Sequence, residues 1–316
     1  MQLFSRIRSA TLAFLLIAAG FLLLRYSPEA AHGAVLSLKL CGTVLLPALF
    51  PFFVLSSLLI SVGAEALFSG LLGKPFRILF RLPEICAAPV FLGMLGGYPV
   101  GARACAALYQ KGRITYGEAT HLLCFCNNCG PAFLISAVGG GLLKQSGVGV
   151  ILFAIHIFSA FLIGFLSRSH QTDGKKVLFM DESNAVPIVP ALIFAVSEAI
   201  PAFLNVCAYV ILFGILTALL QQIPVLKDGL FSTILLGNLE MTCGISRACG
   251  TVSDMRILYP MLSFFAGWGG LSVQMQSATL LEAVGLPCRS YLLAKLAQGA
   301  IAAGITFILF SLRLSL

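Results

Sequence analysis

The sequence has few charged residues. Only 20 of its 316 residues are Lys or Arg and 12 are Asp or Glu, so charged side chains make up 10% of the chain, whereas an ordinary soluble domain has about 25%. Hydrophobic residues make up 59%, and the mean hydropathy is +0.99. Apolar runs occupy almost the whole chain and leave no stretch for a separate aqueous domain. The sequence therefore predicts an all-α, polytopic integral membrane protein whose surroundings are the lipid bilayer.

Motifs that would indicate an enzyme are also missing. The chain has no Walker loop, no nucleophile elbow, no His-Glu-x-x-His pair and no Asp-rich motif. The net charge of +8 comes from Lys and Arg in short loops, where such residues set the orientation of membrane helices, so we expect no nucleic-acid partner. The ten Cys lie mostly in apolar runs and do not indicate a disulfide framework. We expect a protein that is not an enzyme and needs no cofactor.

The apolar runs predict about eight membrane segments. Two runs are overlong and contain prolines: 34–63 holds Pro47 and Pro51, and 186–220 holds Pro190 and Pro201. Each is expected to be a kinked or two-part helix, because proline removes a backbone donor and clashes with the preceding turn. Plainer spans are expected at 10–24, 147–167 and 291–312.

The first of these runs has two interpretations. Arg6 and Arg8 precede it and small residues follow it, which is the pattern of a cleaved signal peptide. Arg25 and Tyr26 close the run as an interfacial anchor does, which favours a retained transmembrane helix with a cytoplasmic N-terminus.

Four further segments carry helix breakers at their centres. Segment 85–108 holds six Gly and Pro residues and is interpreted as a re-entrant hairpin. Segment 65–81, which precedes it and is not one of the four, alternates basic and apolar residues, as a helix in the membrane interface does. The others are 119–141, 230–249 and 257–281. Irregular backbone at membrane depth survives only where protein or a wet cavity surrounds it, so these segments are expected to be central.

The order of these features recurs along the chain. Placing Pro47-Ala48-Leu49 over Pro190-Ala191-Leu192 brings Gly97 to Glu240 and Gly101 to Gly244. The expected domains are an N-terminal transmembrane helix (1–33), a first repeat (34–167), a cytoplasmic loop (168–185) and a second repeat with a C-terminal helix (186–316).

Loop charges indicate how the two repeats are oriented. With a cytoplasmic N-terminus, the expected inside loops hold ten basic residues and the outside loops four, an asymmetry that supports this assignment. The two overlong runs then cross in opposite directions, so the repeats are inverted, which is typical of transporters with a site near the midplane. The inside residues are Lys74, Arg77, Arg81, Arg103, Lys111, Arg113, Arg168, Lys175, Lys176 and Arg289, and the outside residues are Arg25, Lys144, Lys227 and Arg256.

The polar side chains inside these segments are the site candidates. Glu240 is an acid in an apolar stretch, which is a functional candidate by default, with a structural pair to Arg247 or Arg103 as the alternative. Glu198 ranks below it. Amides at the other breaks can donate hydrogen bonds to a solute and accept them from it, or they can cap helices. The glycines allow either a backbone with positive φ or close packing of helices. The candidates are Gly97, Tyr98, Pro99, Gly101, Asn127, Asn128, Gly130, Pro131, Glu240, Thr242, Gly244 and Gln274.

A His-x-x-Cys-x-Cys-x-x-Cys run from His121 to Cys129 invites a metal interpretation. The thiols of a Cys-x-Cys pair on a helix point about 200° apart, and no second ligand cluster is present. Packing of small side chains is favoured, and no metal site is expected. His156 lies on an apolar span, and we interpret it as a hydrogen-bonded core histidine in preference to a proton relay.

Three motifs carry a resemblance to a known family: Leu-Pro-Ala-Leu-Phe-Pro-Phe-Phe-Val-Leu at 46–55, Gly-Tyr-Pro-Val-Gly-Ala at 97–102, and Asn-Asn-Cys-Gly-Pro at 127–131. With Lys111-Gly112, they make the chain, from about 44 to 303, similar to sporulation integral membrane proteins of the YlbJ type, within the wider nucleoside recognition (Gate) group. The chain is shorter than the better-known members and richer in Cys at 124–129.

The resemblance implies a multi-pass bacterial inner-membrane protein with two Gate-like repeats. It implies a permease that moves a small polar, nucleoside-like solute in a process linked to sporulation. A coupling ion and a homo-oligomeric state are further expectations. The alternative is a non-transporting assembly protein of the spore envelope. A third hypothesis is metal-ion permeation through the Cys-rich segment.

Overall fold

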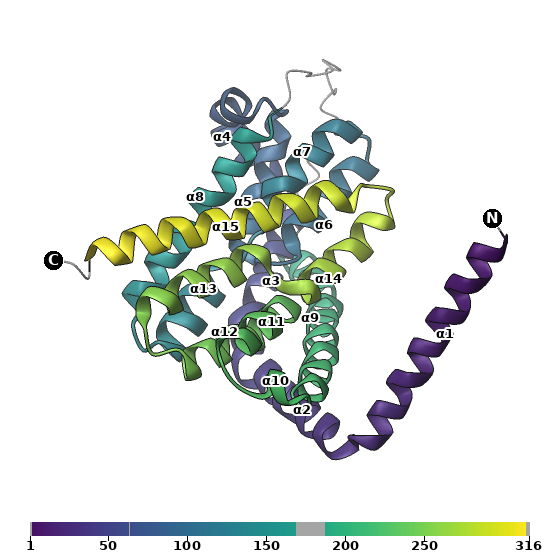
Figure 1. Ribbon diagram of the computed structural model, residues 1–316. Helices are drawn as coiled ribbons and strands as arrows, with labels where there is room; N and C mark the ends of the chain where they lie inside the picture. Colours follow the sequence, from purple (N-terminus) through teal and green to yellow (C-terminus); the bar gives the residue numbers. More distant parts are fainter. Residues whose placement is uncertain (1, 63, 169–186, 314–316) are drawn as a thin grey trace.

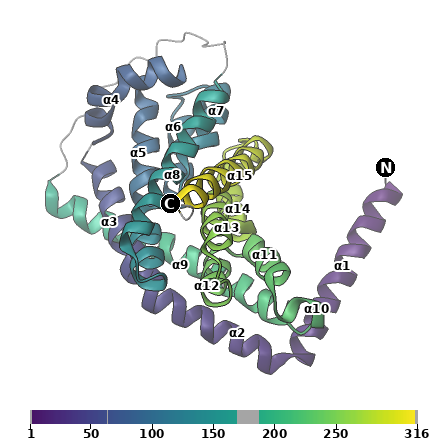
Figure 2. The same ribbon diagram turned by 60° about the vertical axis from the view of Figure 1, so that its left-hand side comes forward.

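The computed structural model describes residues 2–62, 64–168 and 187–313, and every regular element within them is helical. The expected loop 168–185 lies outside the described residues except for Arg168. The first helix, α1 (Gln2–Arg25), stands to one side of the body and is followed at Tyr26 by α2 (Ser27–Leu40) (Figures 1 and 2). The all-α class predicted from composition is confirmed.

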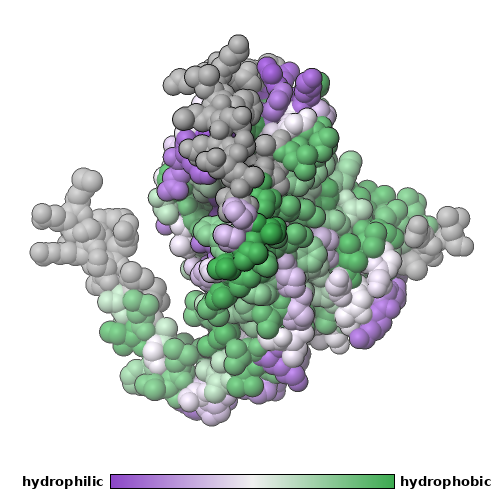
Figure 3. Space-filling model, turned by 180° about the vertical axis from the view of Figure 1, so that it is seen from behind, coloured by the Kyte–Doolittle hydropathy of each residue, from purple (hydrophilic) through white to green (hydrophobic). Residues whose placement is uncertain are grey.

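Four helices among the described residues are long and apolar enough to cross a membrane. They are Ser27–Leu59, Ser146–Leu166, Ile188–Leu220 and Cys288–Leu312. A fifth is added if Leu67–Phe80 and Glu84–Gly96, which meet at a bend of 102°, count as one broken span. Hydrophobic residues cover the middle of the face in Figure 3, and hydrophilic residues lie mainly toward its ends. These features confirm a multi-pass membrane protein.

The first overlong run is not divided at its prolines. A π-helical turn, η1 (Cys41–Leu45), joins α2 to α3 (Leu46–Ser61) without a gap. The ring of Pro47 would clash with the carbonyl of Thr43, four residues earlier, in an ordinary α-helix. Because Thr43 lies in the wider π turn, the helix accommodates this proline and continues.

The second overlong run is also continuous. Helix α9 (Ile188–Leu220) passes through both Pro190 and Pro201, so the prediction of a broken run was wrong. Pro190 lies in the first turn, where a backbone N–H has no partner within the helix and its loss costs little. Pro201 is accepted inside the helix, and α9 packs along both α2 and α3.

The interruptions occur instead in four pairs of short helices, at the segments rich in Gly and polar residues. Each pair consists of two helices of 10 to 14 residues, too short to cross a bilayer singly. The pairs are α5 (Ala87–Gly96) with α6 (Val100–Gln110), α7 (Tyr116–Cys126) with the π-helix η3 (Ala132–Leu142), α11 (Leu230–Leu239) with α12 (Met241–Thr251), and α13 (Met255–Trp268) with α14 (Gly270–Glu282).

The remaining helices enclose these pairs. Helix α4 (Ala64–Phe80) and the 3-10 turn η2 (Glu84–Cys86) precede α5, α8 (Ser146–Leu166) packs on η3, and α15 (Cys288–Arg313) packs on both α13 and α8. The Phe125 ring packs against the rings of Phe76 and Phe80, with centroids 5.9 and 4.6 Å apart. This aromatic contact fixes α7, and with it the break after Cys126, against α4.

Figure 1 places α4 and the connection between α6 and α7 at one end of the body, with α10 (Pro224–Lys227) and the turn between α1 and α2 at the other. The expected inside and outside loops at these four places thus lie at opposite ends. Several of these basic residues lie within helices rather than in loops, among them Lys74 and Arg77 in α4 and Arg103 in α6.

Candidate functional site

The four interruptions meet at the centre of the molecule. A Cβ placed on Gly97 would lie 3.1 Å from the backbone nitrogen of Gly130, so the first and second breaks touch. A Cβ on Gly270 would lie 3.0 Å from the nitrogen of Met241, so the third and fourth breaks touch in the same way. The hydroxyl of Tyr98 donates to the carbonyl of Ala266 at 3.0 Å and links the two pairs.

The glycines at these breaks have different roles. Gly97 has a φ of +78°, a conformation that residues with a Cβ rarely adopt. Gly101 is instead needed for space, because its Cβ would lie 2.0 Å from the carbonyl oxygen of Cys126. Gly244 packs directly on Gly237. Close packing, the alternative interpretation of the glycines, therefore holds for Gly101 and Gly244.

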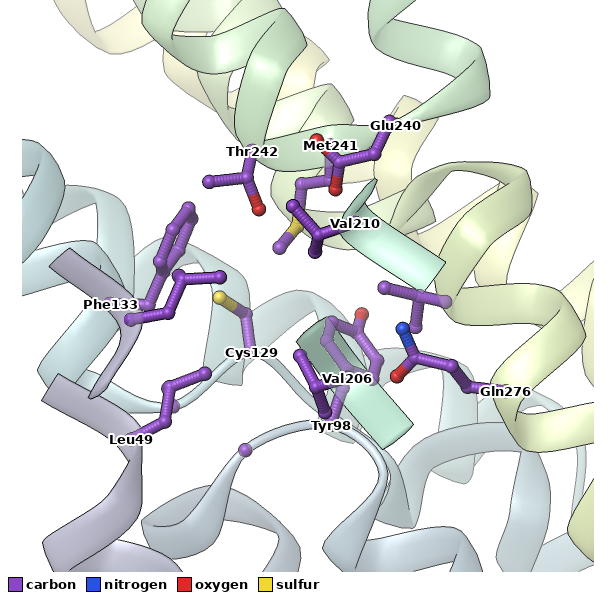
Figure 4. A pocket seen from close by; sticks show the side chains of 14 residues that line it. Leu49, Tyr98, Cys129, Phe133, Val206, Val210, Glu240, Met241, Thr242 and Gln276 are labelled. Atoms are coloured by element: carbon purple, nitrogen blue, oxygen red, sulfur yellow. The ribbon is translucent and has the colours of Figure 1, made fainter. Parts of the chain in front are cut away.

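A small cavity, here called the central cavity, lies where the breaks meet (Figure 4). Its volume is about 40 Å³, which is room for a few water molecules. Glu240, Met241 and Thr242 face it from one side, and Tyr98 and Gln276 face it from the other. Its lining residues are Leu45, Leu49, Gly97, Tyr98, Cys129, Gly130, Phe133, Val206, Val210, Glu240, Met241, Thr242, Val273 and Gln276.

Glu240 is itself the third break. Its backbone is extended, it is 1% exposed, and its carboxylate caps α12 by accepting from the Cys243 N–H at 2.6 Å. The Ser272 hydroxyl approaches the other carboxylate oxygen at 3.5 Å. A carboxylate has about four acceptor positions, so Glu240 keeps acceptor capacity toward the cavity.

Neither arginine pairs with Glu240, so that structural alternative was wrong. The Arg247 guanidinium donates to the carbonyl of Lys227 at 2.6 Å and lies 3.8 Å from the Asp228 carboxylate. Arg103 instead forms an ion pair with Glu198 on α9.

Both asparagines of the second break lie behind the cavity wall, fully buried. Asn127 accepts from the Ala102 N–H at 3.3 Å and donates to the hydroxyls of Ser277 and Tyr291. Asn128 donates to the carbonyl of Phe125 at 2.7 Å and accepts from Gln298. Their polar groups thus join the break to α14 and α15.

The other candidate residues fall into two groups. Gly97, Tyr98, Gly130, Glu240 and Thr242 line the central cavity. Pro99, Gly101, Pro131, Gly244 and Gln274 are not in its lining, although Gln274 is buried and donates to the carbonyl of Trp268.

Sequence reasoning missed a buried lysine beside this site. Lys295, on α15, is 0% exposed, and its ammonium donates to the carbonyl of Asn127 at 2.6 Å and to Gln298 at 2.5 Å. It also lies 5.0 Å from the centre of the Tyr98 ring. The rule that singled out Glu240, that an intramembrane charge is a functional candidate, would have found Lys295 as well.

A larger cavity, here called the side cavity, adjoins the central one. Its volume is about 440 Å³, and Phe133 and Thr242 line both cavities. Thr43, Ser136, Thr242 and Ser246 give its wall four hydroxyls among apolar side chains. Phe133 therefore forms part of the partition between the two spaces.

The Cys-rich segment makes separate local contacts. The Cys124 thiol donates to the carbonyl of Thr120, Cys126 donates to Gly101, and His121 contacts the carbonyl of Gly164. Within the described part of the chain, no three His, Cys, Asp or Glu side chains are grouped closely enough to hold a metal ion. His156 accepts from the Cys129 N–H at 3.0 Å and is buried, as a hydrogen-bonded core histidine would be.

The Arg103–Glu198 pair gives a first testable prediction. It joins α6 to α9 across the two halves of the chain, with side chains that are 46% and 34% exposed, and removing one partner leaves the other charge unpaired on the apolar surface of the molecule. We expect Arg103→Gln and Glu198→Gln each to lower the thermal unfolding temperature of the purified protein, and the double variant to be more stable than either. Losses that simply add would contradict this.

Comparison with known proteins gives one informative match. The sporulation integral membrane protein YlbJ of Bacillus subtilis (strain 168) is 29% identical over an alignment of 337 positions, which covers 94% of this chain and 82% of that protein. No family model matches the chain, and no solved structure matches it. The similarity extends over nearly the whole chain. The chain is thus similar over most of its length to a sporulation integral membrane protein of the YlbJ type.

Proposed function

We propose that this protein is a permease of the nucleoside recognition (Gate) kind, which moves a small polar solute across the bacterial inner membrane in a process linked to sporulation. The central cavity supports the proposal most strongly. It places a buried carboxylate, a tyrosine, a threonine and an amide together where four helices are interrupted. Such a site suits a solute with several hydrogen-bonding groups, and the protein acts by binding and movement rather than by catalysis.

The arrangement of elements supports two inverted repeats. In each half a long helix precedes two interrupted pairs and a closing long helix: α5–α6, α7–η3 and α8 in one, α11–α12, α13–α14 and α15 in the other. In the first half α4 and η2 lie between the long helix and the first pair. In each half the two breaks touch. With a cytoplasmic N-terminus and about eight membrane segments, the pairs α5–α6 and α11–α12 enter from opposite sides, which suits alternating access.

The conformation described is a closed one under this proposal. The central cavity, at about 40 Å³, is far smaller than the roughly 300 Å³ of a small-molecule site. The side cavity, at about 440 Å³, is large enough. We propose that the solute passes between them when Phe133 moves aside.

Phe133 therefore provides a test of the path. We expect Phe133→Leu to raise the uptake rate, because the smaller side chain opens the partition, and Phe133→Trp to lower it. Because Phe133 is buried, Phe133→Leu also leaves a small cavity, which costs about 1 kcal/mol or more of folding stability. Phe264→Leu, a half-buried residue of α13 outside both linings, is the control. Equal rates in all four proteins would exclude Phe133 from the path.

Uptake by proteoliposomes tests the function itself. Purified protein is reconstituted and offered radiolabelled nucleosides, nucleobases and amino acids, and at least one is expected to accumulate faster than in protein-free vesicles. If none does, the second candidate is favoured: a non-transporting assembly protein of the spore envelope. The small central cavity and the internally bonded amides of Asn127 and Asn128 favour that role, and crosslinking in sporulating cells would then trap a specific partner.

A further inference from the structure

The ammonium of Lys295 is held by neutral groups only. It donates to the Asn127 carbonyl at 2.6 Å and to the Gln298 side-chain oxygen at 2.5 Å, and it lies over the Tyr98 ring, whose centre is 5.0 Å away. An ammonium over an aromatic face is attracted by the ring quadrupole. These contacts are with two neutral oxygens and an aromatic ring, and none of them is with an acid.

No carboxylate balances this charge among the described residues. The ion pairs found there are Arg103–Glu198, Arg247–Asp228 and Arg256–Asp254. The buried acid Glu240 is engaged at the start of α12. A buried amine is costly to charge unless oxygens and dipoles replace its water, so the ammonium form needs a position with acceptors or a negative dipole beside it.

The end of α7 supplies that position. This helix ends at Cys126, and Asn127 follows with an extended backbone. The last carbonyls of a helix have no partner within it and carry the negative end of its dipole. In transporters with interrupted helices, the unwound carbonyls and half-helix C-terminal ends are where the coupling cation binds.

We propose that the Lys295 ammonium is a built-in cation, which occupies at the α7 break the position that a monovalent coupling cation would otherwise take. The protein then needs no sodium or potassium ion at this break, and removing the ammonium creates a site for a small monovalent cation. This inference rests on the proposed function only where it speaks of coupling, because the cation position itself is defined by Asn127, Gln298 and Tyr98.

The surrounding contacts explain why the lysine can replace an ion. Asn127 also donates to Ser277 and Tyr291, and Gln298 donates to Asn128. Tyr291 and Gln298, which flank Lys295 on α15, therefore both contact the break. Through Tyr98 the ammonium also contacts a residue of the central cavity. A cation fixed to α15 thus keeps the break and the cavity wall in one arrangement.

Thermal unfolding of detergent-solubilised protein tests this inference without any transport assay. Unfolding temperatures are measured at constant ionic strength in the chlorides of sodium, potassium, methylammonium and N-methylglucamine, the last being too large to enter. We expect the wild-type protein to unfold at the same temperature in all four salts. We expect Lys295→Ala to unfold at a lower temperature in N-methylglucamine and to be restored, saturably, by at least one small cation, since a bound ion stabilises by mass action.

Lys39→Ala, an exposed lysine of α2, is the matched control and should show neither the loss nor the rescue. If Lys295→Ala cannot be purified, Lys295→Ser leaves similar space, adds an oxygen ligand and should show the same rescue. A variant that no small cation restores would overturn the proposal, and so would a wild-type protein that sodium or potassium stabilises specifically. Because no solute is present, failure of the permease proposal would leave these results unaffected.

Discussion

Replacing Glu240 by glutamine is expected to lower solute uptake about ten- to a hundredfold while leaving the fold intact. The carboxylate faces the central cavity and is the acid in its lining, and a hydrogen bond to a charged group contributes about 1.5–3 kcal/mol. Glutamine keeps an oxygen that can accept from the Cys243 N–H, so the start of α12 is preserved. Initial uptake rates in proteoliposomes measure the loss.

The matched control for this prediction is Glu282→Gln. Glu282 ends α14 and is exposed, so the same chemical change there removes a charge without touching the cavity. Its uptake should equal that of the wild-type protein. Normal uptake by Glu240→Gln would remove Glu240 from the site, and similar unfolding temperatures for the two variants would show that the comparison concerns function.

A methyl group at Gly101 is expected to destabilise the protein severely. A Cβ there would lie 2.0 Å from the carbonyl oxygen of Cys126 and 2.9 Å from the Cα of Asn127, and both are backbone atoms that cannot turn away. Forcing extra volume into a packed core costs about 1–3 kcal/mol and sometimes more. Gly101→Ala should therefore yield little monodisperse protein in detergent, or protein with a clearly lower unfolding temperature.

Gly304→Ala is the corresponding control, because a Cβ at this position of α15 meets nothing within 4 Å. It should behave as the wild-type protein does, or be slightly more stable, since alanine is a better helix former than glycine. If Gly101→Ala were as stable as Gly304→Ala, the first two breaks would not be packed against each other as described.

Composition and breaker positions predicted the class of fold well. The four segments rich in Gly and polar residues are the four interrupted ones, because freed backbone groups need partners that only the protein centre provides. The prolines misled, since Pro190 lies in a first helical turn and Pro47 follows a π turn. Where a proline falls relative to the start of a helix decides its effect, and the sequence alone left that start uncertain.

The site was predicted only in part, because the sequence does not show which way a side chain points. Spacing along the chain placed Tyr98, Asn127 and Glu240 at breaks, and all three are buried at breaks. Whether a side chain points into a cavity or behind its wall depends on contacts between distant segments. Asn127 turns toward Ser277, 150 residues away, whereas Tyr98 faces the cavity.

Lys295 was overlooked because of where the last membrane helix was expected to begin. The last apolar run was taken to begin at Tyr291, which makes Lys295 resemble a basic residue near the membrane surface. Helix α15 begins earlier, at Cys288, and packs across α8 and α13, so this lysine lies among the breaks. The packing of α15 places it beside Asn127 and Tyr98.

A thermal-shift screen of detergent-solubilised protein tests the central claim most directly. Wild-type protein and Glu240→Gln are unfolded in the presence of nucleosides, nucleobases, amino acids and divalent metal ions. The account predicts that one class of organic solute raises the unfolding temperature of the wild-type protein, as a ligand at a hundred times its Kd stabilises by about 2.7 kcal/mol, and raises that of Glu240→Gln much less. A shift of equal size in both proteins, or no shift with any solute, would contradict a solute site in the central cavity.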